Sequence, residues 1–185
     1  MFGATALAAL LLAVVAGCAS DLAASGAGPL QLPQHYGFMA APMRTGSFHS
    51  FDVCAARQPI RLRVVDVRAG RLVGTSRVRF AVAWPRPGQV LASAGRLPLE
   101  PGYRPAAGAA GRIRACADMS GPGMAVVVVL PPARERTVVV HDVEITYRVG
   151  ERQYTTVARV RLGTCASDPL SPSAQPRECR KPAGA

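Results

Sequence analysis

The chain has 185 residues, 49% of them apolar, and its 22 Lys and Arg against 11 Asp and Glu give a formal net charge of +11. This length and apolar content suit one domain with a hydrophobic core. The sequence carries no GxSxG turn, phosphate-binding loop, dinucleotide fingerprint or nucleic-acid-binding motif. Its few acids do not cluster beside aromatic residues, as glycosidase chemistry would require. We therefore expect no catalytic site, no cofactor and no nucleic-acid partner.

The chain begins with an apolar segment. Residues 2–17 contain no charge and consist mainly of Ala, Leu and Val. A membrane span needs about 20 apolar residues, so this segment is short for one. Its length and its small residues at the end are typical of a signal peptide. We predict a signal helix over residues 1–17, and hence export.

The end of this segment reads Val15, Ala16, Gly17 and Cys18. These four residues resemble the lipobox of bacterial lipoproteins, and the resemblance covers only the first eighteen residues. It implies a diacylglycerol thioether on Cys18, with acyl chains such as palmitate, and cleavage just before that residue. It also implies a protein held by lipid on the outer, extracytoplasmic face of a bacterial cell membrane. The alternatives are an ordinary signal peptide followed by an incidental cysteine, and an uncleaved segment retained as a membrane anchor.

Four cysteines follow Cys18, and an even number in an exported chain predicts two disulfides. Three pairings are possible. We favour Cys54–Cys116 together with Cys165–Cys179, because the second bridge would tie a Pro-rich tail to the last strand.

The pattern after residue 18 predicts an all-β domain. Residues 18–53 are expected to form a tether and an irregular segment, 54–165 a β-sandwich, and 166–185 a Pro- and Ser-rich tail. Apolar residues alternate over 60–67 with a bulge at Val64–Val65, and Ala69–Gly70 indicates a turn. The fully apolar run 124–130 fits a strand covered on both faces. Residues 138–147 and 153–162 predict a long hairpin. The expected fold is an antiparallel, immunoglobulin-like sandwich of six to seven strands.

One segment offers soft metal ligands. His35, Met39, Met43 and His49 supply imidazole and thioether groups, which suit copper. The competing interpretation is ordinary apolar packing by the methionines, with exposed histidines in a loop.

The other candidate site is arginine-rich. All but one of the 22 basic residues are arginine, and many alternate with apolar strand residues. Guanidinium groups bind phosphate and carboxylate through pairs of hydrogen bonds. Several arginines on one face of a sheet would therefore attract anionic envelope polymer or lipid headgroups. The competing interpretations are a solvated face and the codon bias of a GC-rich genome. The anion-binding candidates are Arg61, Arg63, Arg77, Arg79, Arg159 and Arg161, with Arg112, Arg114 and Arg148 in similar positions.

Taken together, these patterns predict a non-enzymatic binding or scaffolding domain of a surface lipoprotein. The alternatives are a metal-handling lipoprotein that uses the His/Met segment, and an enzyme of unrecognised type. His141 and Asp142 are adjacent in a predicted strand, so we expect them on opposite faces and not as a catalytic dyad. The sequence names no protein partner.

Overall fold

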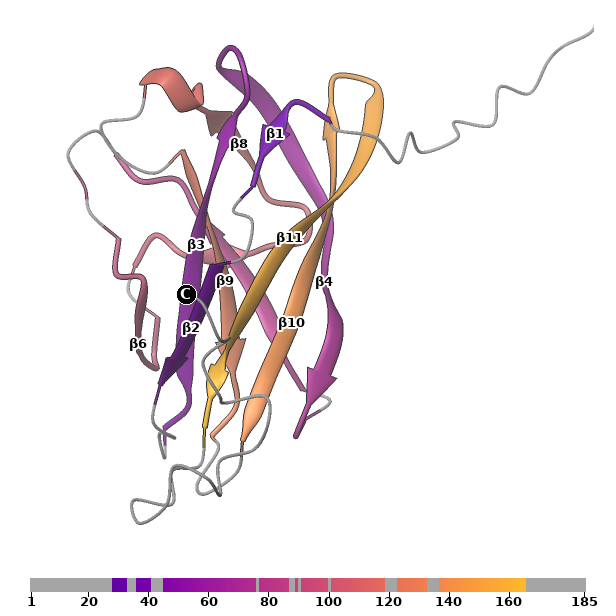
Figure 1. Cartoon of the computed structure of the whole chain (residues 1–185). Coiled ribbons are helices and arrows are strands. Elements are labelled where there is room, and N and C mark those ends of the chain that lie inside the picture. Colours follow the sequence, from indigo (N-terminus) through magenta and orange to yellow (C-terminus); the bar gives the residue numbers. More distant parts are fainter. Residues whose placement is uncertain are drawn as a thin grey trace, which may run out of the picture.

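The chain forms two β-sheets that pack face to face (Figure 1), in a computed structural model. The structure describes residues 28–32, 36–40, 45–75, 77–86, 89, 91–99, 101–118, 123–132 and 137–165. Residues 1–27 and 166–185, which include the predicted signal helix, Cys18 and Cys179, lie outside this part. Within it, the only helix is a 3-10 turn, η1 (Cys116–Asp118), and no helix is long and apolar enough to cross a membrane.

The first sheet is built around a strand that is buried on both faces. Every residue of β9 is buried, as the apolar run 124–130 predicts. On one side of β9 lies β3. The edge of β3 that faces away from β9 pairs with β1 near Ala55 and with β6 near Ser47. On the other side lie β5 and then β7. The bounds are β1 (Leu30–Gln31), β3 (Ser47–Ala55), β5 (Arg79–Ala83), β6 (Ala94–Arg96), β7 (Arg104–Pro105) and β9 (Met124–Leu130).

The second sheet contains the predicted hairpin at its centre. Its order is β2-β11-β10-β4-β8, and all of its pairs are antiparallel except β2–β11. The hairpin turns through Gly150 and Glu151, with Gly150 at a φ of 58°, the positive value that glycine adopts without steric cost. The bounds are β2 (Tyr36–Ala40), β4 (Ile60–Val73), β8 (Ala110–Ile113), β10 (Val138–Val149) and β11 (Arg152–Thr164).

The core lies between the sheets. Inward side chains such as Phe51, Val64, Val126 and Ile145 belong to one buried cluster. Tyr147 is completely buried and stacks on Tyr154 of the neighbouring strand, with 5.5 Å between the ring centroids. A second, smaller cluster covers the outer face of the first sheet, where Phe48 packs against Tyr103. The all-β sandwich predicted from the sequence is therefore present.

Three details differ from the sequence prediction. The first is the domain boundary, because β1, β2 and most of β3 lie within residues 18–53. Alternation fails to reveal β3 because Ser47–Phe51 are all buried, their outer side chains being covered by the second cluster. The second is the strand count: the described residues form eleven strands, of which β1, β6, β7 and β8 have four residues or fewer.

The third detail concerns β4, which runs without a turn through Ala69–Gly70. Gly70 lies opposite Asp142, a non-glycine residue at a φ of 55°, and a Cβ on Gly70 would be 3.3 Å from the Asp142 Cβ. This glycine therefore makes room between strands and does not end one. The bulge near Val64–Val65 is present, but Val65 points outward and is 38% exposed, whereas Val64 and Val67 are in the core.

A disulfide joins Cys54 in β3 to Cys116 in η1, as predicted. It lies beside the bridge between Ala55 and Ala115, so it fixes the chain after β8 to the end of β3. Cys165 is also disulfide-bonded, and its expected partner, Cys179, lies outside the described residues.

Candidate anion-binding site

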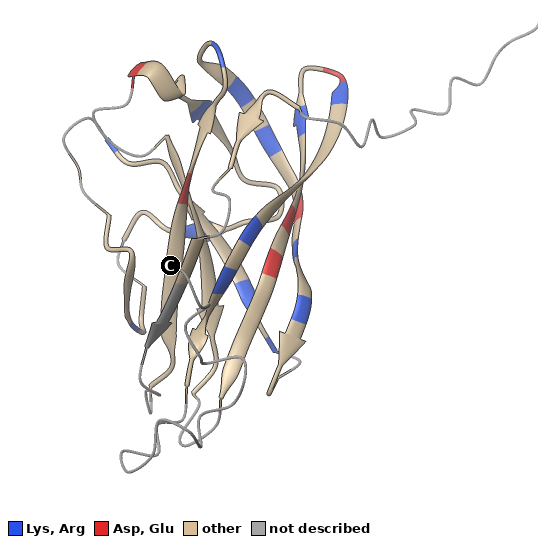
Figure 2. Ribbon diagram, viewed as in Figure 1, with Lys and Arg blue, Asp and Glu red and all other residues tan. Residues whose placement is uncertain are grey.

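The predicted arginines divide between the two sheets. Most lie on the outer face of the second sheet, and Figure 2 shows blue segments along β4 and β11, whereas β10 carries red along its length and Arg148 near its end. Arg79 belongs to β5 of the first sheet, and Arg77 directly precedes that strand. The arginines on the outer face of the second sheet are Arg61, Arg63, Arg68, Arg71, Arg112, Arg148, Arg159 and Arg161.

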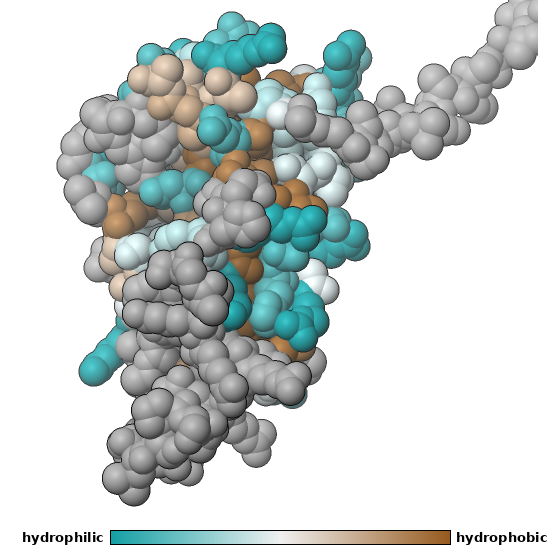
Figure 3. All heavy atoms as spheres, viewed as in Figure 1, coloured by the Kyte–Doolittle hydropathy of each residue, from teal (hydrophilic) through white to brown (hydrophobic). Residues whose placement is uncertain are grey.

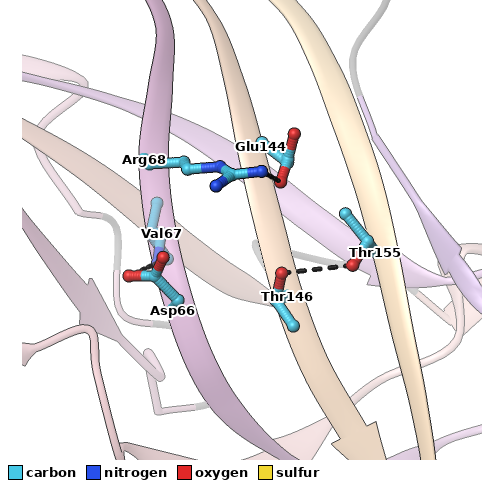
Figure 4. A network of polar contacts seen from close by, with 6 residues as sticks. All are labelled: Asp66, Val67, Arg68, Glu144, Thr146 and Thr155. Carbon is cyan, nitrogen blue, oxygen red and sulfur yellow. Dashed lines mark hydrogen bonds and ion pairs between the residues drawn. The ribbon is translucent and has the colours of Figure 1, made fainter. Parts of the chain in front are cut away.

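At the middle of this face the arginines are matched by acceptors. Arg159 donates to Asp142 over 3.0 Å, and Arg68 forms an ion pair with Glu144 (Figure 4). Arg71 donates to Nε2 of His141, with 2.9 Å between the nitrogens. The two ion pairs are exposed, so each contributes little to stability, but their carboxylates offset the charges of Arg68 and Arg159.

The middle of the face is also held by uncharged polar contacts. The hydroxyls of Thr146 and Thr155 lie 3.2 Å apart across β10 and β11, and Asp66 accepts a hydrogen bond from the Val67 amide (Figure 4). Asp66 is therefore engaged locally and is not part of any ion pair among the described residues.

Toward the hairpin turn the pattern changes, because arginine faces arginine. Arg61 is the direct cross-strand partner of Arg112, and Arg63 is the direct partner of Arg148. None of the ion pairs within the described residues includes any of these four side chains. Among the described residues, Arg148 donates to the neutral amide oxygen of Gln153, over 3.2 Å, and to no carboxylate. We call Arg61, Arg63, Arg112 and Arg148 the arginine cluster.

The position of the arginine cluster has an electrostatic cost. Directly opposed residues on a sheet have Cβ atoms about 4.5–5.5 Å apart, and like charges in such pairs are destabilising. Two such pairs side by side, with no ion pair to a carboxylate among the described residues, create a strong positive potential. An anion placed there would relieve the repulsion.

A cavity opens within the arginine cluster. It has a volume of about 340 Å³ and is lined by Arg61, Leu62, Arg63, Arg148 and Gly150. A groove of about 770 Å³ begins at the remaining member, Arg112, and follows the β8 edge past Trp84 to Arg86 and Arg104. Figure 3 shows hydrophilic side chains over the second sheet and at the end that carries its hairpin turn. A mainly apolar cleft of about 590 Å³ lies on the other sheet beside Leu97 and Tyr103.

The surroundings of the arginine cluster are also basic. We define the hairpin end of the sandwich as the end that holds the β10–β11 turn and the β3–β4 turn, residues 56–59. Exposed Arg57 and Arg152 lie in or beside these turns, with Glu151 as the acid in the hairpin turn. Figure 2 shows several blue segments at the hairpin end, together with red in the hairpin turn and in η1, whose acid is Asp118.

The titratable groups with displaced pKa values lie elsewhere. Burial lowers the pKa of His49 to about 4, although a hydrogen bond with the Gly163 backbone opposes the change. Burial raises the pKa of Tyr147 to about 12 and also raises that of Asp52. Burial, and then the charge of Asp52, raise the pKa of Tyr36. These groups are distributed through the fold and do not line the arginine cluster.

The proposed copper ligands receive different placements. His49 is 1% exposed inside the sandwich, so the expectation of an exposed loop histidine is wrong for this residue. Met39 lies in β2 opposite Gly163 in the strand register, while His35 and Met43 lie outside the described residues. The described residues contain no group of three or more His, Cys, Asp and Glu side chains that could hold a metal ion. The copper alternative stays a prediction.

His141 and Asp142 also differ from expectation. Val140 and Val143 both point into the core, so the two residues between them share the outer face, where the β10–β11 register shifts. Each bonds a different arginine, His141 to Arg71 and Asp142 to Arg159. The prediction of opposite faces is wrong, because it assumes a regular strand.

Comparison with known proteins identifies no family for this chain. No protein-family model and no curated protein matches the chain. A solved structure titled as the N-terminal domain of PorA is similar at 11% identity and a TM-score of 0.31, covering 72% of this chain and 89% of that one. Likeness at this level does not assign the chain to a family.

Proposed function

We propose that this protein is a lipid-anchored, extracytoplasmic β-sandwich that binds phosphate-bearing anions without catalysis. The lipobox resemblance at Val15–Cys18 supports the anchor, and disulfide bonding at Cys54, Cys116 and Cys165 is compatible with an oxidising compartment outside the cytoplasm. The binding role rests on one observation, the arginine cluster with its two like-charged cross-strand pairs.

The chemistry of the arginine cluster suits phosphate groups. Each guanidinium offers several N–H donors in a planar fork that matches two oxygens of one phosphate. Four such groups on adjacent strands could contact successive phosphates of a chain, or several phosphates on a surface. Arg159 and Arg161 are less suited, because Arg159 is committed to Asp142 and Arg161 lies opposite His141, away from the cavity.

Calorimetric titration with inorganic polyphosphate tests this proposal. The protein is the chain from residue 18 onward carrying Cys18→Ser, which keeps every described residue. At about 50 mM salt we expect binding, with a slope of log K against log salt of about −3 if all four arginines contact phosphate, using the per-contact values for nucleic acids. Replacing Arg61 and Arg63 by Gln should weaken binding by roughly 10-fold or more.

The matched control is Arg159→Gln with Arg161→Gln, which removes the same charge from the same sheet face. This variant should keep most of the affinity. Equal losses in the two double variants would show that net charge, and not the arginine cluster, attracts the polyanion. Because all four side chains point outward, circular dichroism should report unchanged folding.

A further inference from the structure

We infer that the hairpin end faces the membrane that carries the lipid anchor, and that the arginine cluster contacts the phosphates of anionic lipid headgroups there. This inference rests on the proposed function, both the anchor and the binding of phosphate groups, and names the partner.

The place where the chain enters the fold supports this orientation. Gly28, the first described residue, packs against the hairpin: a Cβ on Gly28 would lie 2.2 Å from Tyr147 Oη and 3.0 Å from Tyr154 Cδ1. Tyr147 directly precedes Arg148 of the arginine cluster. The next element, β1, pairs Leu30 with Ala55, the last residue of β3 before the β3–β4 turn. The chain therefore enters at the hairpin end (Figure 1).

The short length of chain between Cys18 and the fold also favours this orientation. Gly28 follows Cys18 by ten positions, and that length of chain spans at most about 35 Å when fully extended. A lipid on Cys18 would therefore keep the hairpin end within about 35 Å of the bilayer surface. The other end of the sandwich is farther by the length of β10, whose 12 residues extend about 40 Å. The anchor favours an orientation with the hairpin end toward the lipid.

The positive charge of the hairpin end favours contact with an anionic bilayer. Besides the arginine cluster, exposed Arg57 and Arg152 lie at the hairpin end, together with the exposed acids Glu151 of the hairpin turn and Asp118 of η1, so the basic residues outnumber these two acids. Each basic residue near an anionic bilayer strengthens association by about fivefold, within a Debye length of about 8 Å at physiological salt. Lipid tether and arginine cluster would then act together on one surface, which favours headgroups over a polymer that must diffuse to the site.

Vesicle binding tests the inference with the Cys18→Ser chain used above. Vesicles containing phosphatidylglycerol should bind the chain at about 50 mM salt, and binding should weaken more than 10-fold by several hundred millimolar. Vesicles of phosphatidylcholine alone should not bind. Vesicles that contain phosphatidylglycerol should slow the hydrogen exchange of backbone amides in residues 56–63 and 148–153. Exchange in residues 45–47 and 73–75, at the other end of the sandwich, should not change.

Two double variants separate the arginine cluster from net charge. Arg63→Gln with Arg148→Gln should weaken vesicle binding by roughly 25-fold, since two contacts of about fivefold each are lost. Arg77→Gln with Arg79→Gln removes the same charge from the first sheet and should leave binding within about twofold.

The outcomes divide clearly. If the chain binds polyphosphate through the arginine cluster but ignores phosphatidylglycerol vesicles, the membrane inference fails and the proposed function stands. Protection at the opposite end, or equal losses in the two double variants, would also overturn the inference. Failure to bind either polyphosphate or vesicles would overturn the inference and the binding role together.

Discussion

Replacing Cys54 and Cys116 together by Ala should lower the free energy of unfolding by about 4 kcal/mol. The disulfide closes a loop with a sequence separation of 62 residues, and loop-closure entropy in the unfolded chain gives a cost of this size. The bridge also fixes η1 to the end of β3, so its loss should loosen the chain after β8. Urea denaturation of the oxidised protein and of the variant measures the difference.

The comparison is Cys165→Ala with Cys179→Ala. The expected Cys165–Cys179 bridge closes a much shorter loop, so its loss should cost less, about 3 kcal/mol. A cost below about 1 kcal/mol for the Cys54–Cys116 variant, with an unchanged denaturant slope, would contradict the role given to this disulfide.

Acidification should destabilise the fold through His49. Its pKa is about 4 in the folded protein and 6.5 without the fold, so between these values the unfolded chain binds a proton that the native chain does not. The stabilisation is fully present above pH 6.5 and is lost as pH falls toward 4. At 1.36 kcal/mol per pKa unit, the loss amounts to about 3 kcal/mol.

A pH series of denaturation curves for the wild type and His49→Gln isolates this effect, because carboxyl groups titrate alike in both. The free-energy difference between the two proteins should change by about 3 kcal/mol between pH 7 and pH 4, in favour of the variant at acid pH. Parallel profiles would show that His49 does not remain neutral in the folded core.

The sequence reveals those elements whose pattern is local. The run 124–130 and the hairpin at 138–162 are recognisable because apolar residues and a Gly-containing turn lie within one segment. The even number of cysteines after Cys18 predicts two disulfides but leaves three pairings open, and the structure contains the favoured Cys54–Cys116 bridge. By contrast, β2 pairs in parallel at a sheet edge, and the short strand β6 pairs with β3 from far along the chain, so neither has a local signal.

The arginine cluster could be predicted from the sequence only in part. Alternation indicates that Arg61, Arg63, Arg112 and Arg148 point outward, but only the register between strands places Arg61 opposite Arg112 and Arg63 opposite Arg148. A shift of one residue would exchange the faces of a strand, and register depends on distant contacts. The same limit applies to the separation of Arg77 and Arg79 onto the other sheet, and to the groove beside Trp84.

We propose that Cys18 anchors this domain to the outside of a bacterial membrane. Intact mass spectrometry of the mature protein, purified from the membrane fraction of a bacterial host, tests it most directly. We expect a chain that begins at Cys18 and carries the added mass of a diacylglyceryl group, and we expect Cys18→Ser to leave the membrane fraction. An unmodified chain cleaved at another position would contradict the claim.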